Sequence, residues 1–66
     1  MHMVTINGNS VDADGMTITE YLQQAQYDPR IVVVERNEEI VPKDSYQDTK
    51  LADGDVIEVV TFMGGG

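Results

Sequence analysis

Cysteine is absent from all 66 residues of this chain, and so is tryptophan. Without cysteine the chain can form neither a disulfide nor a thiolate metal site, and any sulfur chemistry has to use another group. A chain of this length makes one domain around one small core. It has no room for a deep substrate pocket.

Basic residues are scarce as well, because four lysines and arginines face twelve acids and give a formal net charge of −8. Such a surface repels phosphates, which argues against a nucleic-acid partner and against an anionic membrane. The acids either keep the chain in solution or steer it toward a basic face of a partner protein. No apolar run spans a membrane and no signal peptide is visible, so we expect a cytoplasmic protein that is monomeric on its own.

Several short stretches have the composition and alternation of β-strands. They are residues 3–6, 9–13, 31–35, 40–41 and 56–63. Asn7-Gly8 is typical of the two-residue turn that joins two strands into a hairpin. Glu35 and Glu58 mark the solvent side of their strands. The core positions predicted from this alternation are Val32, Val34, Ile57 and Val59.

One segment has the pattern of an amphipathic helix. Thr17-Ile18-Thr19-Glu20 fits a capping box, in which the two end side chains accept hydrogen bonds from each other's backbone N–H. The apolar residues that follow recur at helical spacing, and they are Ile18, Tyr21, Leu22 and Ala25. Because Pro29 cannot continue a helix, we expect the helix to end near Gln26.

The predicted order is hairpin, helix, strand, turn over residues 36–39, short edge strand, loop and final strand. One helix on one face of a mixed four- to five-stranded sheet is an α+β arrangement, compatible with a ubiquitin-like β-grasp fold. In that fold the last strand lies centrally beside the first. Tyr46 is expected to anchor the polar segment 43–50 to the core. Residues 1–63 would form the β-grasp domain and residues 64–66 a flexible tail.

Three glycines, Gly64, Gly65 and Gly66, close the sequence directly after the last predicted strand. Three extended residues reach about 10 Å, and glycine has no Cβ to obstruct a narrow passage. We therefore interpret Gly64 and Gly65 as a segment that threads into a partner's active site and presents the carboxylate of Gly66. A frayed chain end or a tag remnant is the plain alternative.

Val60 and Phe62 share the outward face of the last strand with Glu58. An exposed aliphatic and aromatic pair just before the glycines is a candidate patch for docking a partner, with Val33 on the same surface. The alternative is that scattered exposed apolar side chains need no explanation.

Nothing in the sequence predicts catalysis by the chain itself. It has no placed histidine and no phosphate-binding glycine loop followed by lysine. Asp12 with Asp14, and Asp53 with Asp55, are interpreted as turn residues and not as metal ligands. We expect no catalytic residue, no metal and no bound cofactor.

Taken together, these features resemble the ThiS family, the sulfur carriers of thiamine biosynthesis. The matching stretches are Val4-Thr5-Ile6-Asn7-Gly8, residues 31–42 with Asn37 and Ile40-Val41-Pro42, Asp53-Gly54-Asp55 and the terminal glycines. They cover nearly the whole chain, and the length agrees. Gly64 goes beyond the minimal Gly-Gly ending of the family.

The resemblance implies a carrier and not an enzyme. A ThiF-type adenylating enzyme would use ATP and Mg²⁺ to adenylate the Gly66 carboxylate. A sulfur-donor protein would replace AMP with sulfur derived from cysteine, and a ThiG-type thiazole synthase would take that sulfur for the thiazole ring. The chemistry agrees, because a carboxylate anion is a poor electrophile until it gains a leaving group. The groups that stabilise the developing charge would come from the partner.

Three other interpretations of the sequence remain open. A MoaD-like carrier for molybdopterin shares the mechanism but is typically longer. A ubiquitin-like modifier shares the tail and would end in an isopeptide bond. A non-covalent β-grasp binding module is a different class, and it would have no use for a free glycine end.

Overall fold

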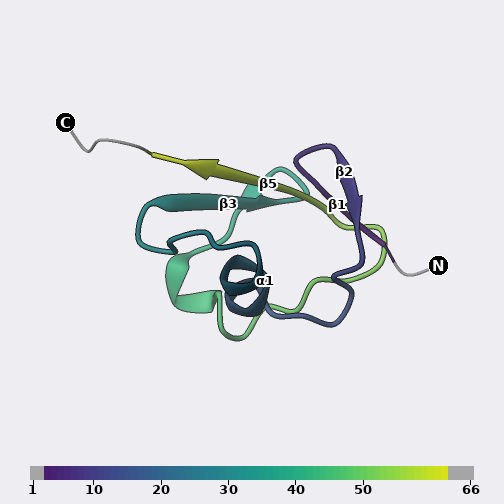
Figure 1. Cartoon of the computed structure of the whole chain (residues 1–66), viewed down its shortest axis with the longest axis horizontal. Helices are drawn as coiled ribbons and strands as arrows, with labels where there is room; N and C mark the ends of the chain where they lie inside the picture. The colour runs from purple at the N-terminus through teal and green to yellow at the C-terminus, as the bar shows by residue number, and fades with distance from the viewer. Residues whose placement is uncertain (1–2, 63–66) are drawn as a thin grey trace.

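In the computed structural model, which describes residues 3–62, five strands form one mixed sheet and a single α-helix covers one of its faces (Figure 1). The elements are β1 (Val4–Ile6), β2 (Asn9–Val11), α1 (Ile18–Gln24), β3 (Val32–Arg36), β4 (Glu39–Ile40), the 3₁₀ helix η1 (Lys43–Ser45) and β5 (Val56–Thr61). No helix in this range is long and apolar enough to cross a membrane.

The strand order is β2-β1-β5-β3-β4, which puts the last strand of the chain in the middle of the sheet. β1 and β2 form one antiparallel hairpin, and β3 and β4 form another. β5 lies between the hairpins, parallel to β1 and antiparallel to β3. The predicted α+β, β-grasp arrangement is confirmed, including the central last strand beside the first.

Both hairpins close through two-residue turns in left-handed backbone. Asn7-Gly8 has φ values of 50° and 84°, as the predicted hairpin turn requires. The second turn is Asn37-Glu38, with φ values of 51° and 72°. Arg36 and Glu39, which we expected in this turn, are instead paired strand residues. The edge strand therefore starts one residue earlier than predicted and ends before Val41, which packs half-buried against the core.

Helix α1 begins as predicted and ends early. Glu20 N donates to Thr17 Oγ1 at 3.1 Å, and Thr17 N donates to Glu20 Oε1 at 2.9 Å, which completes the capping box. Gln26 adopts a left-handed φ of 64° and ends the helix before Pro29 is reached. The prediction that Ala25 belongs to the buried stripe is wrong, because it lies past the last helical turn and is exposed.

The core lies between α1 and the face of the sheet turned toward it. Its buried members are Val4, Ile6, Ala13, Ile18, Leu22, Val32, Val34, Tyr46, Leu51, Ile57 and Val59. All four core positions predicted from strand alternation are among them. Tyr46 is 4% exposed and anchors its segment as expected. Each fully buried leucine, isoleucine or valine side chain stabilises the fold by about 1.5–3 kcal/mol relative to an exposed one. This core packs against one side of the sheet only.

Candidate functional site

The sheet face turned away from α1 is left uncovered by the described residues (Figure 1). We call the outward side chains of β5, β3 and β4 on this side the open face. Its members are Val33, Glu35, Ile40, Val56, Glu58, Val60 and Phe62. Ile40 is 68% exposed and Phe62 is 59% exposed, which is unusual for large apolar side chains that share one surface.

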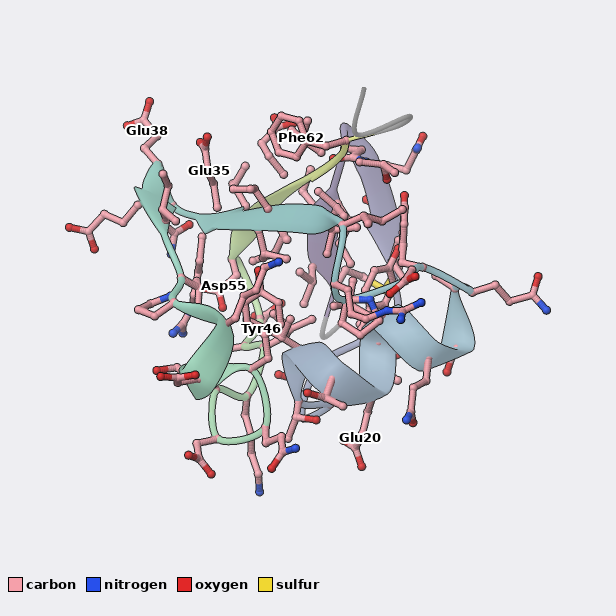
Figure 2. All side chains as sticks on the ribbon, turned by 90° about the vertical axis from the view of Figure 1, so that its left-hand side faces the viewer. Glu20, Glu35, Glu38, Tyr46, Asp55 and Phe62 are labelled. Atoms are coloured by element: carbon pink, nitrogen blue, oxygen red, sulfur yellow. The ribbon has the colours of Figure 1, made fainter. Side chains whose placement is uncertain are left out.

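The strand register brings the four predicted patch residues onto this one face. Val33 lies directly opposite Val60. Phe62 N donates to Ile31 O at 2.8 Å, so the pairing of β5 with the β3 side continues past the end of the strand. In Figure 2, Phe62 and Glu35 project from one side of the β3 ribbon, whereas Tyr46 and Asp55 lie on the other. The outward placement is confirmed, and a docking role stays a prediction.

Sequence reasoning missed three members of the open face as part of the patch: Glu35, Ile40 and Val56. Glu35 served only to orient its strand. Val56 lies two positions before Glu58 on β5, so strand alternation could have placed it on the same outward face. Ile40 needed the register of the second hairpin, in which it pairs with Glu35. The two-residue turn Asn37-Glu38 is the signal that sets this register.

Two charged side chains of the open face meet across the sheet. Glu35 and Glu58 are directly paired in the β3–β5 ladder. Within residues 3–62 neither carboxylate has a salt bridge, since the salt bridges recorded there join Arg30 to Asp28 and Arg36 to Asp55. The open face is thus apolar with a paired acidic centre.

The start of β5 is fixed by Asp55, a buried carboxylate that the sequence indicated only as a turn residue. Asp55 accepts hydrogen bonds from Arg36 Nε at 2.9 Å, from Asn37 Nδ2 at 3.1 Å and from Ala52 N at 2.9 Å. Burial raises the pKa of this carboxyl, but the three donors outweigh burial and hold the pKa below its ordinary value. The network ties the second hairpin to the turn that leads into β5.

No cluster of three or more histidine, cysteine or acidic side chains that could hold a metal occurs among residues 3–62. Asp55 is engaged as described, and Asp53 Oδ1 accepts from Met3 N at 3.0 Å. Asp53 and Asp55 therefore support the turn, as we predicted for this pair.

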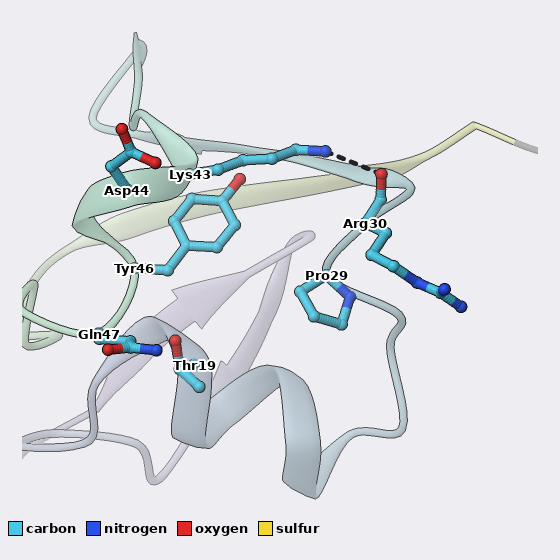
Figure 3. A pocket seen from close by; sticks show the side chains of 7 residues that line it. All are labelled: Thr19, Pro29, Arg30, Lys43, Asp44, Tyr46 and Gln47. Atoms are coloured by element: carbon cyan, nitrogen blue, oxygen red, sulfur yellow. Dashed lines mark hydrogen bonds between the residues drawn. The ribbon is translucent and has the colours of Figure 1, made fainter.

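A shallow hollow on the helix side is a second place to look for a site (Figure 3). It is lined by Thr19, Pro29, Arg30, Lys43, Asp44, Tyr46 and Gln47. Lys43 Nζ donates to Arg30 O at 2.8 Å, and the Arg30 guanidinium binds Asp28 with its closest contact at 2.9 Å. This contact lowers the pKa of Asp28 to about 2, chiefly through the side-chain hydrogen bond. Both cations are paired, so the hollow is a weaker candidate than the open face.

Gly64, Gly65 and Gly66 lie outside the described residues, as does the predicted strand end at Met63. The predicted tail therefore rests on the sequence. What the structure adds is the strand before it: β5 is paired on both sides up to Val59 and leads directly to Phe62 on the open face.

Comparison with known proteins gives one consistent result. The ThiS family profile matches residues 2–66. A sulfur carrier protein ThiS from Bacillus subtilis is 46% identical over 66 residues, which covers 97% of this chain and all of the relative. The crystal structure of a thiamine biosynthesis protein (ThiS) from Geobacter metallireducens superposes with a TM-score of 0.79 at 35% identity, covering 97% of this chain and 99% of the other.

A different kind of relative is also similar to this chain. A thiazole synthase from Paramagnetospirillum magneticum is 45% identical over 64 residues, which is 96% of this chain but only 20% of the relative. A segment like the whole of this chain is thus one part of a longer protein there.

Proposed function

Because the chain belongs to the ThiS family, the sulfur carriers of thiamine biosynthesis, we propose that the carboxylate of Gly66 is the group that carries the sulfur. As a member of this family the chain is a carrier and not a catalyst. The observation that carries the proposal is the position of β5, the central strand of the sheet, which leads from the core to the glycines.

The chemistry takes place in two steps on the chain's last residue. A carboxylate oxygen of Gly66 attacks the α-phosphorus of ATP, pyrophosphate leaves, and an acyl adenylate forms. Sulfur at the oxidation level of sulfide, supplied by a donor protein, then attacks the acyl carbon, AMP leaves with the electrons of the C–O bond that breaks, and a thiocarboxylate remains. ATP and Mg²⁺ belong to a ThiF-type adenylating enzyme, which would also supply the groups that stabilise the developing charge. Residues 3–62 of this chain contain no cluster of three or more histidine, cysteine or acidic side chains that could hold the metal.

Gly64 and Gly65 thread into the narrow entrance of the partner's active site. Without a Cβ, these residues let the partner's backbone and side chains approach closely. The body of the carrier stops at this entrance, and only the terminal glycines pass through it.

Docking uses the open face. Val60 and Phe62 supply exposed apolar surface of the kind that is buried at protein interfaces. Val33 is half-buried opposite Val60, and Glu58 lies on the same face of the sheet. The face leads directly into the tail, so a partner that covers it is positioned to receive Gly66.

The acceptor of the sulfur is a ThiG-type thiazole synthase. The support is the thiazole synthase of Paramagnetospirillum magneticum, which has a segment 45% identical to this chain. We propose that this chain associates with such a synthase in the cytoplasm.

The mass of the intact chain tests the proposal. Incubation with ATP, Mg²⁺, the adenylating enzyme and a sulfur donor should give the mass change of one oxygen exchanged for sulfur. A matched variant with one alanine appended after Gly66 should show no change, because its terminal carboxylate lies beyond the threaded position. Equal conversion of both chains, or of neither, would contradict the assignment of Gly66.

A further inference from the structure

We expect the Glu35–Glu58 pair to lower the stability of the fold that contains it. The two residues are direct partners in the antiparallel β3–β5 ladder, on the open face. Like charges at such positions are destabilising, because their side chains are held a few ångströms apart. Nothing in the core or in the turns depends on either carboxylate, since both point away from α1.

The chain places its own cations elsewhere. All four basic residues lie within residues 3–62, and none of them faces the pair. Arg36 binds Asp55 at 2.9 Å, and Arg30 binds Asp28 at 2.9 Å. Lys43 donates to the carbonyl of Arg30 at 2.8 Å, and the backbone of Lys50 forms a β-bridge with Thr17 at the start of α1, away from β3 and β5. Residues 3–62 therefore provide no counter-charge for Glu35 and Glu58.

We propose that the surface that covers the open face is apolar and carries a guanidinium or ammonium group that lies between Glu35 and Glu58. This inference rests on the proposed function, and the occupant is the adenylating enzyme that receives the tail. Ile40 continues the same row across the sheet beside Glu35, and Val60 follows Glu58 on β5. A cation at the centre is thus surrounded by apolar contacts that exclude water.

A second copy of this chain does not have the required chemistry. Two copies packed face to face would bring the carboxylates of one against those of the other, and each chain has a net charge of −8. The arrangement instead selects a cationic partner among proteins with an otherwise similar apolar surface, because any other partner leaves the two carboxylates repelling each other at a dry interface.

The test compares two double variants that remove the same number of charges. Glu35→Gln with Glu58→Gln neutralises the pair while keeping its shape. Asp44→Asn with Asp48→Asn removes two exposed acids from the segment that packs beside the start of α1. Melting and the Kd for the adenylating enzyme are measured for each at low and high salt.

We expect the Glu35/Glu58 variant to melt higher than the unchanged chain and to bind at least about tenfold more weakly, with a flatter salt dependence. The Asp44/Asp48 variant should bind as the unchanged chain does. Equal weakening by both variants would mean that only total charge matters, and unchanged binding of the Glu35/Glu58 variant would mean that no cation meets the pair. Either outcome overturns the inference, as does sedimentation of the unchanged chain as a dimer that the Glu35/Glu58 variant tightens.

The same samples separate this inference from the proposed function. If the unchanged chain gains the mass of the oxygen-to-sulfur exchange and the Glu35/Glu58 variant binds normally, then only the proposal that a partner's cation meets this pair is wrong. If the unchanged chain binds the enzyme but never gains that mass, then the role of Gly66 is wrong.

Discussion

The side chain of Asn7 pairs with the backbone of Val59 as if it were one more residue of strand β1. Val59 N donates to Asn7 Oδ1 at 2.8 Å, and Asn7 Nδ2 donates to Val59 O at 3.2 Å. β1 itself stops at Ile6, which pairs with Ile57. The amide thus extends the support of β5 by two residues toward the end of the strand.

Removing this amide should destabilise the domain. Asn7→Gly keeps a residue that tolerates the φ of 50° but loses both bonds, at an expected cost of about 1–3 kcal/mol. Asn7→Ala should cost about 1 kcal/mol more, because it adds the strain of a left-handed alanine. Urea unfolding measures both values. If Asn7→Gly is as stable as the unchanged chain, the side-chain pairing contributes nothing.

Acid should remove the stabilisation that Asp55 provides. Its pKa in the folded state lies below the unfolded value, so its contribution is complete above the ordinary carboxyl pKa of 3.8 and is lost as the pH falls through the lowered one. Asp55→Asn should cost about 2–3 kcal/mol at about pH 7, since it leaves Arg36 without its carboxylate.

The pH dependence separates this effect from simple loss of packing. Unfolding free energies of the unchanged chain and of Asp55→Asn should converge as the pH drops below about 4. Asp48→Asn, at an exposed position, serves as the control for loss of one acidic side chain and should be as stable as the unchanged chain at about pH 7. If the difference in unfolding free energy between the unchanged chain and Asp55→Asn stays constant down to about pH 2, the ionic role of Asp55 is contradicted.

A charge on the open face should block docking and spare the fold. Phe62 is 59% exposed, so Phe62→Glu should change the unfolding free energy by no more than about 0.5 kcal/mol. Binding to the adenylating enzyme should weaken by at least about tenfold. Gln23→Glu adds the same charge on the exposed side of α1 and should bind normally. Normal binding of Phe62→Glu would show that the partner uses another surface.

A side chain in the tail should block chemistry and spare docking. Gly65→Val should abolish pyrophosphate release in the presence of ATP and the adenylating enzyme, because its branched Cβ does not fit a passage shaped for glycine. The variant should still compete with the unchanged chain for the enzyme, since the open face is intact. An unaltered rate would show that the passage is wide at this position.

The sequence predicted those parts of the fold that depend on neighbouring residues. Thr17 and Glu20 lie three positions apart, so their capping box was visible in the sequence. Glu58 marked the solvent side of β5 because alternation is local to a strand. The resemblance to the ThiS family was also visible in the sequence, because it rests on short stretches of residues and on chain length.

What the sequence did not predict depends on distant partners or on unusual backbone. The donors to Asp55 include Arg36 and Asn37, which lie 19 and 18 positions away, so the residue looked like an ordinary turn aspartate. Gln26 ends α1 in a conformation that glutamine seldom adopts, which no local pattern signals. Glu35 and Glu58 face each other because of the register between β3 and β5, and a single strand's sequence does not show that register.

The place of β5 in the sheet also affects how the protein is made. The two hairpins do not pair with each other, and β5, which joins them, is synthesised after all four of their strands. A product ending at Asp55 lacks Ile57 and Val59 from its core, and circular dichroism should find it unfolded. We therefore expect a chain that stops before β5 to lack both the complete sheet and the open face, and not to bind the adenylating enzyme.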